Sequence, residues 1–200
     1  MKKKLIILIT GQKSRLELSS KIKNIIQPLK NIYNIMVVLS LSSTEIYTNK
    51  RKYMMGGVVE SSNIASELMH IPHYINKIDY PEFKINEGLF SMYDKSYLGL
   101  EYKTKRAKNH VRQYYTLFRS WPIIKRFNPD LLIRIRDDAM LKHPIKLPNL
   151  IKYQNKKNFM ITPIENSWGG INDKFAIISK SAIEAYLTKP FQVYMEKKKI

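Results

Sequence analysis

Residues 131–141 read LLIRIRDDAML, and this stretch decides both the expected fold and the expected site. It follows the turn-forming residues Asn128–Asp130 and begins as an apolar, β-rich run, so we predict a strand that starts at Leu131. Two adjacent carboxylates, Asp137 and Asp138, close the strand. Because ligands of α/β proteins bind at the carboxyl ends of strands, this pair marks a candidate site.

Side chains alternate along a strand, which predicts Arg134, Arg136 and Asp138 on one face and Asp137 on the other. Two cations and an anion at a strand end suit a metal–phosphate complex, with Asp138 on the metal and the arginines on phosphate oxygens. The alternative is structural, because an Asp-Asp pair after a strand often forms a solvated turn or a helix N-cap. The nearby arginines would then simply pair with the two carboxylates. Spacing alone leaves both interpretations open.

The beginning of the chain reads as strand, helix and strand. We predict a strand over Lys4–Thr10, a loop over Gly11–Arg15 and a second strand over Ile35–Leu41. Between them, apolar residues recur at helical spacing from Leu18 to Leu29. This order predicts a parallel sheet with right-handed crossovers. Gly11 allows the first loop to approach a nucleotide closely.

Further along, the clearest helix spans Ala107–Phe127, and Pro122 is expected to kink or split it. Polar side chains near its start, Arg112 among them, are suited to contact a ligand. A strand is predicted over Lys174–Ile178, followed by a helix with a capping box formed by Ser181 and Glu184.

Residues 42–103 are harder to interpret and predict one short helix and one strand. The fold class expected for the whole chain is α/β. We expect residues 1–200 to form a single Rossmann-like domain with a mostly parallel central sheet flanked by helices.

The composition is strongly basic, with 35 Lys and Arg against 16 Asp and Glu and a formal net charge of +19. This balance points to polyanions, anionic surfaces or phosphate-bearing ligands. The excess is mostly lysine spread over the whole chain, which an AT-rich genome would also produce. Cysteine is absent, which excludes a disulfide framework and cysteine zinc sites.

The start of the chain imitates a signal peptide, but its apolar run, Leu5–Ile9, is shorter than the hydrophobic segment of one. No stretch reaches the length of a membrane span. We therefore expect a cytoplasmic protein without a membrane span.

Four motifs occur in order along the chain. They are Gly11-Gln12-x-x-Arg15, a helix with Gln113-Tyr114-Tyr115 and Trp121, Arg134-x-Arg136-x-Asp138, and Trp168-Gly169-Gly170-Ile171-Asn172-Asp173-Lys174-Phe175-Ala176. This order resembles GT-A-type nucleotide-sugar glycosyltransferases, and more narrowly the small domains with which large DNA viruses glycosylate their capsid proteins. The resemblance covers most of the chain and is weakest over residues 42–103.

The resemblance implies metal-dependent transfer of a sugar from a nucleoside-diphosphate sugar, expected to be UDP-linked, to a hydroxyl of a glycan or glycoprotein. A viral capsid glycoprotein is one such acceptor, and the host cytoplasm or virus factory is the matching location. The implied metal ion is Mn or Mg, held by Asp138 and Asp137. The implied donor-binding residues are Gly11, Arg15, Arg134, Arg136 and Asp137. Asp173 is the implied catalytic base, which corresponds to single displacement with inversion.

The chain departs from the family pattern at two places. The usual metal motif is Asp-x-Asp, whereas here Arg136 occupies the first position and Asp137 or a water must substitute. The acceptor-side carboxylate, Asp173, falls one place later than in inverting galactosyltransferases, where Asn172 would align.

Two other classes of function stay open. A basic nucleic-acid-binding or metal-dependent nuclease domain would use the positive charge and the interleaved tyrosines. Against it, the basic residues do not cluster in one segment and no recognition motif is present, so no specific nucleic acid is expected. A non-catalytic structural virion protein that keeps the fold is the third class.

Overall fold

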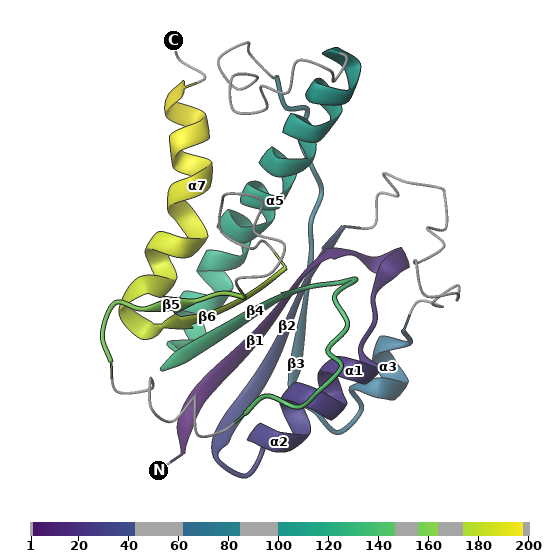
Figure 1. Cartoon of the computed structure of the whole chain (residues 1–200), viewed down its shortest axis with the longest axis vertical. Coiled ribbons are helices and arrows are strands. Elements are labelled where there is room, and N and C mark those ends of the chain that lie inside the picture. Colours follow the sequence, from purple (N-terminus) through teal and green to yellow (C-terminus); the bar gives the residue numbers. More distant parts are fainter. Residues whose placement is uncertain (1, 43–61, 85–99, 147–155, 164–173, 198–200) are drawn as a thin grey trace.

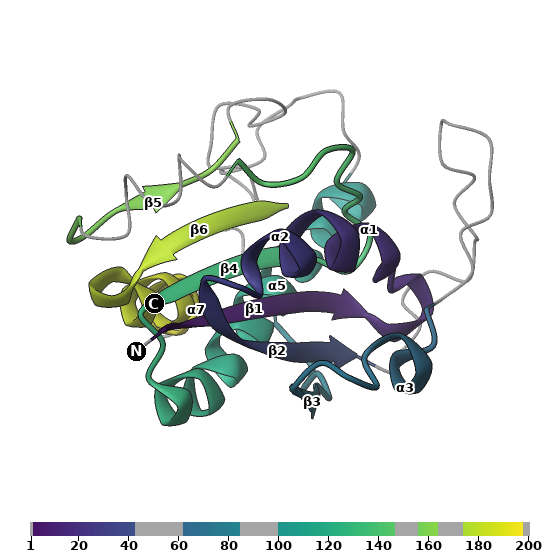
Figure 2. The same ribbon diagram turned by 90° about the horizontal axis from the view of Figure 1, so that it is seen from below.

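The computed structural model describes residues 2–42, 62–84, 100–146, 156–163 and 174–197. These residues form a six-stranded sheet with helices on both faces (Figure 1). The strands are β1 (Lys3–Gln12), β2 (Tyr33–Ser42), β3 (His73–Lys77), β4 (Leu131–Arg136), β5 (Met160–Ile161) and β6 (Phe175–Ser179). Their order across the sheet is β3-β2-β1-β4-β6-β5 (Figure 2).

Strand direction divides the sheet into two parts. The strands β3, β2, β1 and β4 are mutually parallel, whereas β6 runs antiparallel to β4 and to β5. The expected α/β class with a mostly parallel sheet is therefore confirmed. From β1 the chain moves outward to β2 and β3, and it then returns to place β4 on the other side of β1. The point where the strand order reverses thus lies between the carboxyl ends of β1 and β4.

The helices cover both faces of the sheet. One continuous helical segment follows β1 and comprises α1 (Ser19–Lys21), η2 (Ile22–Ile26) and α2 (Gln27–Leu29). It lies on one face, and the long helices α5 (Leu100–Phe127) and α7 (Ile183–Lys197) lie side by side on the other (Figure 1). The remaining elements are η1 (Lys13–Arg15), α3 (Ile64–Glu67) and η4 (Lys180–Ala182).

Alternation along the strands sends their side chains into two separate cores. Ile133 and Ile135 of β4 pack with the residues of the helical segment 19–29, whereas Leu132 packs with Leu117 and Ile124 of α5. Burial of a large aliphatic side chain stabilises the fold by roughly 1.5–3 kcal/mol, so both faces contribute. Arg134 shares the strand face of Leu132, which places its side chain on the α5 side of the sheet.

Three predictions of local structure need correction. Residues Gly11 and Gln12 extend β1, because both pair with β2, and only Lys13–Arg15 leave the sheet. Pro122 lies inside α5 and does not split it, since buried side chains on both sides of the proline hold the helix against the sheet, and a kink at this residue stays a prediction. Ser181 lies within η4 and its hydroxyl accepts a hydrogen bond from the Asn158 amide at 3.0 Å, so it does not cap α7.

An aromatic cluster joins α5 to α7. Phe83, Val111, Phe191 and Tyr194 are buried there, and Tyr115 contacts the rings of Phe83 and Phe191 edge-on. These contacts pack the middle of α5 against α7.

Among the residues that the structure describes, no helix combines the length and the apolar character that crossing a membrane requires.

Candidate functional site

The predicted site residues converge at the reversal point between β1 and β4. Gly11 lies near the end of β1, Arg15 follows in η1, and Asp137 and Asp138 come directly after β4. Arg136, the last residue of β4, is paired in register with Thr10 of β1. Asp173, the predicted base, lies outside the described residues.

The carboxylate of Asp137 is buried and joins the two strand ends. Its side chain is 1% exposed, and its Oδ2 accepts a hydrogen bond from the Gln12 amide at 2.9 Å. The Asp137 amide in turn donates to the Thr10 carbonyl at 2.9 Å. The Nη2 atom of Arg15 lies 2.9 Å from Oδ2 and completes the ion pair. Asp137 therefore connects β1, η1 and the turn after β4.

Gly11 makes room for this carboxylate. Its φ angle is +145°, and a Cβ atom on it would lie 2.1 Å from Oδ1 of Asp137. Both the backbone angle and the lack of space require glycine at this position. The structure thus gives Gly11 a steric role next to Asp137, and its predicted contact with a nucleotide stays a prediction.

Asp138 is held by two arginines. Arg136 donates to it in a bidentate manner, from Nε to Oδ1 at 3.0 Å and from Nη2 to Oδ2 at 2.9 Å. The Nη1 atom of Arg15 lies 3.3 Å from Oδ2. Because Arg15 contacts both carboxylates, the two acids and the two arginines form one charge-compensated group. Such charge-assisted pairs are stronger than neutral hydrogen bonds.

The two carboxyl groups have pKa values shifted in opposite directions. Burial and the adjacent charge of Asp138 raise the pKa of Asp137, although Arg15 and the Gln12 amide oppose this shift. Burial also acts to raise the pKa of Asp138, but Arg136 and Arg15 outweigh it, so the pKa of Asp138 is lowered. Asp138 is therefore the acid whose charged form the surroundings favour.

A divalent cation fits Asp138 better than Asp137. The side chain of Asp138 is 13% exposed, and the bonds that occupy its oxygens come from arginine side chains, which can rotate away. Asp137 is closed by a backbone amide and by the tight contact with Gly11. Within the described ranges, no three histidine or acidic side chains gather around a common point. Metal binding by the two acids stays a prediction.

Arg134 is buried beside Thr10 of β1. Its residue surface is 3% exposed, and its Nε donates to the Thr10 hydroxyl at 3.1 Å. In the part of the chain that the structure describes, no carboxylate pairs with its guanidinium group. A buried cation without a counter-ion is costly unless a ligand supplies the negative charge.

Arg112 of α5 is a half-buried cation near the site. Its guanidinium carbon lies 5.8 Å from the ring centroid of Tyr80, and its buried Nε has no hydrogen-bond partner within the described ranges. Burial raises the pKa of the Tyr80 hydroxyl, which bonds to Thr116 at 3.0 Å and also feels the charges of Arg112, Asp137 and Arg15. No sequence motif singles out Tyr80, because it lies in an irregular segment.

Sequence reasoning also missed Lys21 and Glu17, which lie beneath the site. Lys21 is fully buried and donates to the carbonyls of Asp137 and Ala139 at 3.0 and 2.7 Å. It also pairs with Oε2 of Glu17 at 3.1 Å. Lys21 lies three residues after Leu18 and four before Ile25, on the apolar face of the helical segment. A lysine at such a position is the sequence signal that could have revealed it.

We expect Gly11→Ala to lower the free energy of unfolding by about 2 kcal/mol or more, because the new Cβ overlaps the Asp137 carboxylate and the backbone angle is strained. Urea denaturation measures the change. In an Asp137→Ala background the same substitution should cost clearly less, since the overlapping atoms are gone. Equal costs in both backgrounds would show that the carboxylate does not cause the loss.

No model of a known protein family matches this sequence, and no curated protein matches it. The resemblance to GT-A-type glycosyltransferases therefore stays a prediction from the sequence motifs quoted above.

Proposed function

We propose that this chain is a glycosyltransferase of GT-A type that transfers a sugar from a UDP-linked donor to a hydroxyl group of a glycan or glycoprotein. The observation that carries this proposal is an excess of arginine where the strand order reverses. Among the described residues, four arginines and two carboxylates lie near this point, which leaves two positive charges in excess. The residues are Arg15, Arg112, Arg134 and Arg136 against Asp137 and Asp138.

The position of this excess supports a phosphate-bearing ligand. In open α/β sheets, ligands occupy the crevice outside the carboxyl ends of the strands where the order reverses. The site lies at that point, between β1 and β4. The leaving diphosphate of a nucleotide sugar carries negative charge that grows as the glycosidic bond breaks, and arginines placed in advance neutralise it.

The arginines would contribute in two ways. Arg134 is buried and has no acidic partner among the described residues, so its charge is already desolvated and acts strongly on a phosphate group. Arg136 and Arg15 can exchange Asp138 for phosphate oxygens, because guanidinium groups bind both in the same bidentate geometry.

The proposed metal ion is Mn or Mg, and Asp138 is the residue that would hold it. When bound, such an ion neutralises diphosphate charge as a Lewis acid. Release of Asp138 by Arg136 would expose the carboxylate oxygens that these hard cations prefer.

The proposed base is Asp173, which would take the proton from the acceptor hydroxyl in a single displacement with inversion. Its neighbour in the sequence, Lys174, supports this assignment, because the Lys174 carbonyl accepts a hydrogen bond from the Arg136 amide at 3.0 Å. The described chain therefore resumes beside the site one residue after Asp173.

We expect Arg134→Met to weaken the binding of uridine diphosphate by about tenfold or more, since a charge-assisted hydrogen bond contributes roughly 1.5–3 kcal/mol. The melting temperature should stay the same or rise, because the substitution removes a buried cation that has no acidic partner in the described part of the chain. Isothermal titration and thermal denaturation measure both effects. Arg119→Met on the exposed side of α5 is the matched control and should leave the affinity unchanged. Unchanged affinity in both variants would refute the role of Arg134.

Manganese should increase the thermal shift that uridine diphosphate produces, because a ligand that binds only the folded state raises its apparent stability. Asp138→Asn should fold and lose this metal-dependent part of the shift, together with transfer activity. Glu196→Gln removes an exposed carboxylate from α7 and should keep both. A full manganese effect in Asp138→Asn would exclude Asp138 as the metal ligand.

Asp173→Asn should lower turnover by about 10²–10⁴-fold, the usual contribution of a positioned acid–base group. Donor affinity should barely change, because the base acts on the acceptor proton. Steady-state kinetics with the donor and its titration in the absence of acceptor separate the two effects. Near-normal turnover, or loss of donor binding instead, would move the base to Glu165 or to another residue.

A further inference from the structure

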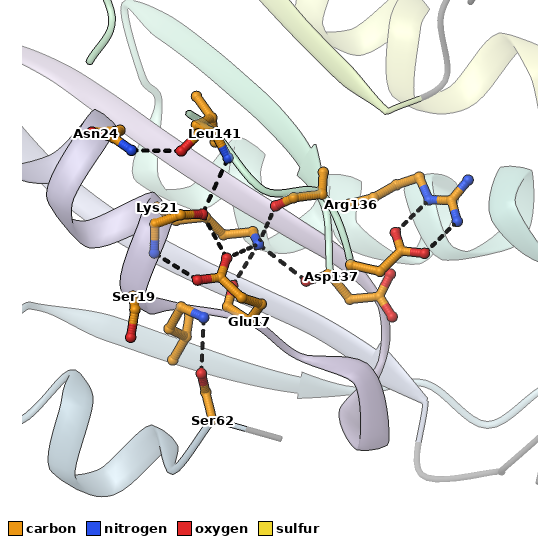
Figure 3. A network of polar contacts seen from close by, with 12 residues as sticks. Glu17, Ser19, Lys21, Asn24, Ser62, Arg136, Asp137 and Leu141 are labelled. Carbon is orange, nitrogen blue, oxygen red and sulfur yellow. Dashed lines mark hydrogen bonds and ion pairs between the residues drawn. The ribbon is translucent and has the colours of Figure 1, made fainter. Parts of the chain in front are cut away.

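We propose that Lys21 is the positioning residue of this site: its buried ammonium group, held between the carbonyls of Asp137 and Ala139, fixes the turn that presents Asp138. Figure 3 shows this ammonium group at the centre of the polar network beneath the site. The inference goes beyond the proposed function, since it concerns a residue that does not contact the ligand.

The ammonium group of Lys21 has four acceptors. It donates to the Asp137 carbonyl at 3.0 Å, to the Ala139 carbonyl at 2.7 Å, and to the carbonyl and Oε2 of Glu17. The two carbonyls of the turn belong to the residues on either side of Asp138. A single cation therefore holds the backbone on both sides of Asp138. This restricts the directions in which the Asp138 side chain can point.

Glu17 strengthens the same contact from the other side. Its amide donates to the Asp137 carbonyl at 3.1 Å, and its carboxylate accepts from the Ser20 amide and hydroxyl, both at 2.6 Å. Glu17 is thereby fixed at the start of α1 and provides the counter-charge for Lys21. The turn after β4 and the beginning of α1 are held together as one unit.

A purely structural role is a poor explanation for this lysine. Burial lowers its pKa, with Glu17 opposing the shift, so the charged form has lost much of its hydration. The neighbouring positions on the same helical face hold Leu18 and Ile25, and an apolar side chain at position 21 would pack there at lower cost. What an apolar side chain cannot do is hold two backbone carbonyls in a fixed direction.

The absence of cysteine from the chain permits a test by chemical replacement. A Lys21→Cys variant is alkylated while unfolded and is then refolded. Bromoethylamine restores an ammonium group at the end of a lysine-length side chain, whereas iodopropane gives a side chain of the same length without the charge. The two products differ only in the terminal group.

The first readout needs no ligand. Amide proton and nitrogen shifts of residues 136–140 should differ from those of the unmodified protein in the propyl form and should return in the aminoethyl form. Asn24→Ala is the matched control, because Asn24 also donates from this helical segment to a backbone carbonyl, that of Leu141, at 2.6 Å. Its shift changes should centre on Leu141 and leave Asp138 largely unaffected.

The second readout is the affinity for uridine diphosphate, and this part rests on the proposed function. The propyl form should bind about tenfold or more weakly, the range usual for residues that orient ligand-binding groups. The aminoethyl form should recover the affinity, and Asn24→Ala should keep it.

The outcomes separate the two proposals. Unchanged amide shifts at Asp138 in the propyl form would overturn the role of Lys21, whatever binds to the site. Shifted amides together with no binding of uridine diphosphate to the unmodified protein would overturn the proposed function and leave the role of Lys21 intact. If the propyl form fails to fold, Lys21→Arg replaces it, because a planar guanidinium cannot meet the same four acceptors. Unchanged turn amides in that variant would again overturn the inference.

Discussion

The buried carboxylate of Asp137 is the interaction on which the geometry of the site depends. It accepts the Gln12 amide at the end of β1, pairs with Arg15 in η1 and begins the turn after β4. These contacts add to the backbone pairing of β1 with β4 and link the carboxyl ends of two strands that are far apart in the sequence. Gly11 must lack a side chain for this to happen, so the glycine in β1 and the acid directly after β4 form one structural unit.

Charge compensation on two levels keeps this unit in place. Above it, Arg15 and Arg136 neutralise the carboxylates of Asp137 and Asp138. Below it, Lys21 binds the carbonyls of the same turn. Removal of one partner from such a buried group is costly, because the remaining charge is left without compensation. The upper contacts involve side chains that a phosphate can attract, whereas the lower contacts involve the backbone. The site therefore combines exchangeable ion pairs with a fixed support.

The parallel half of the fold could be predicted, because continuous apolar runs such as Leu5–Ile9 and a βαβ order indicate strands buried on both faces. The antiparallel direction of β6 could not be predicted, because it depends on where the chain enters the sheet and with which strand it pairs. The proximity of Arg15 to the two acids could be predicted, because the carboxyl ends of parallel strands lie at the same edge of a sheet. The contact between Lys21 and the turn could not be foreseen in the same way. It joins residues more than a hundred positions apart through the backbone, which no side-chain pattern encodes.

The arrangement of charges at the site is more informative about function than the net charge of +19. The lysine surplus is spread along the chain, and genome composition accounts for it as well as a partner does. Arg134 and Arg112 are different, because both lie near the reversal point and neither has a carboxylate partner among the described residues. Strand alternation places Arg134 on the α5 side, opposite to Asp137, so the acid that holds the strands cannot also neutralise it. A separation of this kind leaves positive charge where a phosphate group can supply the missing partner.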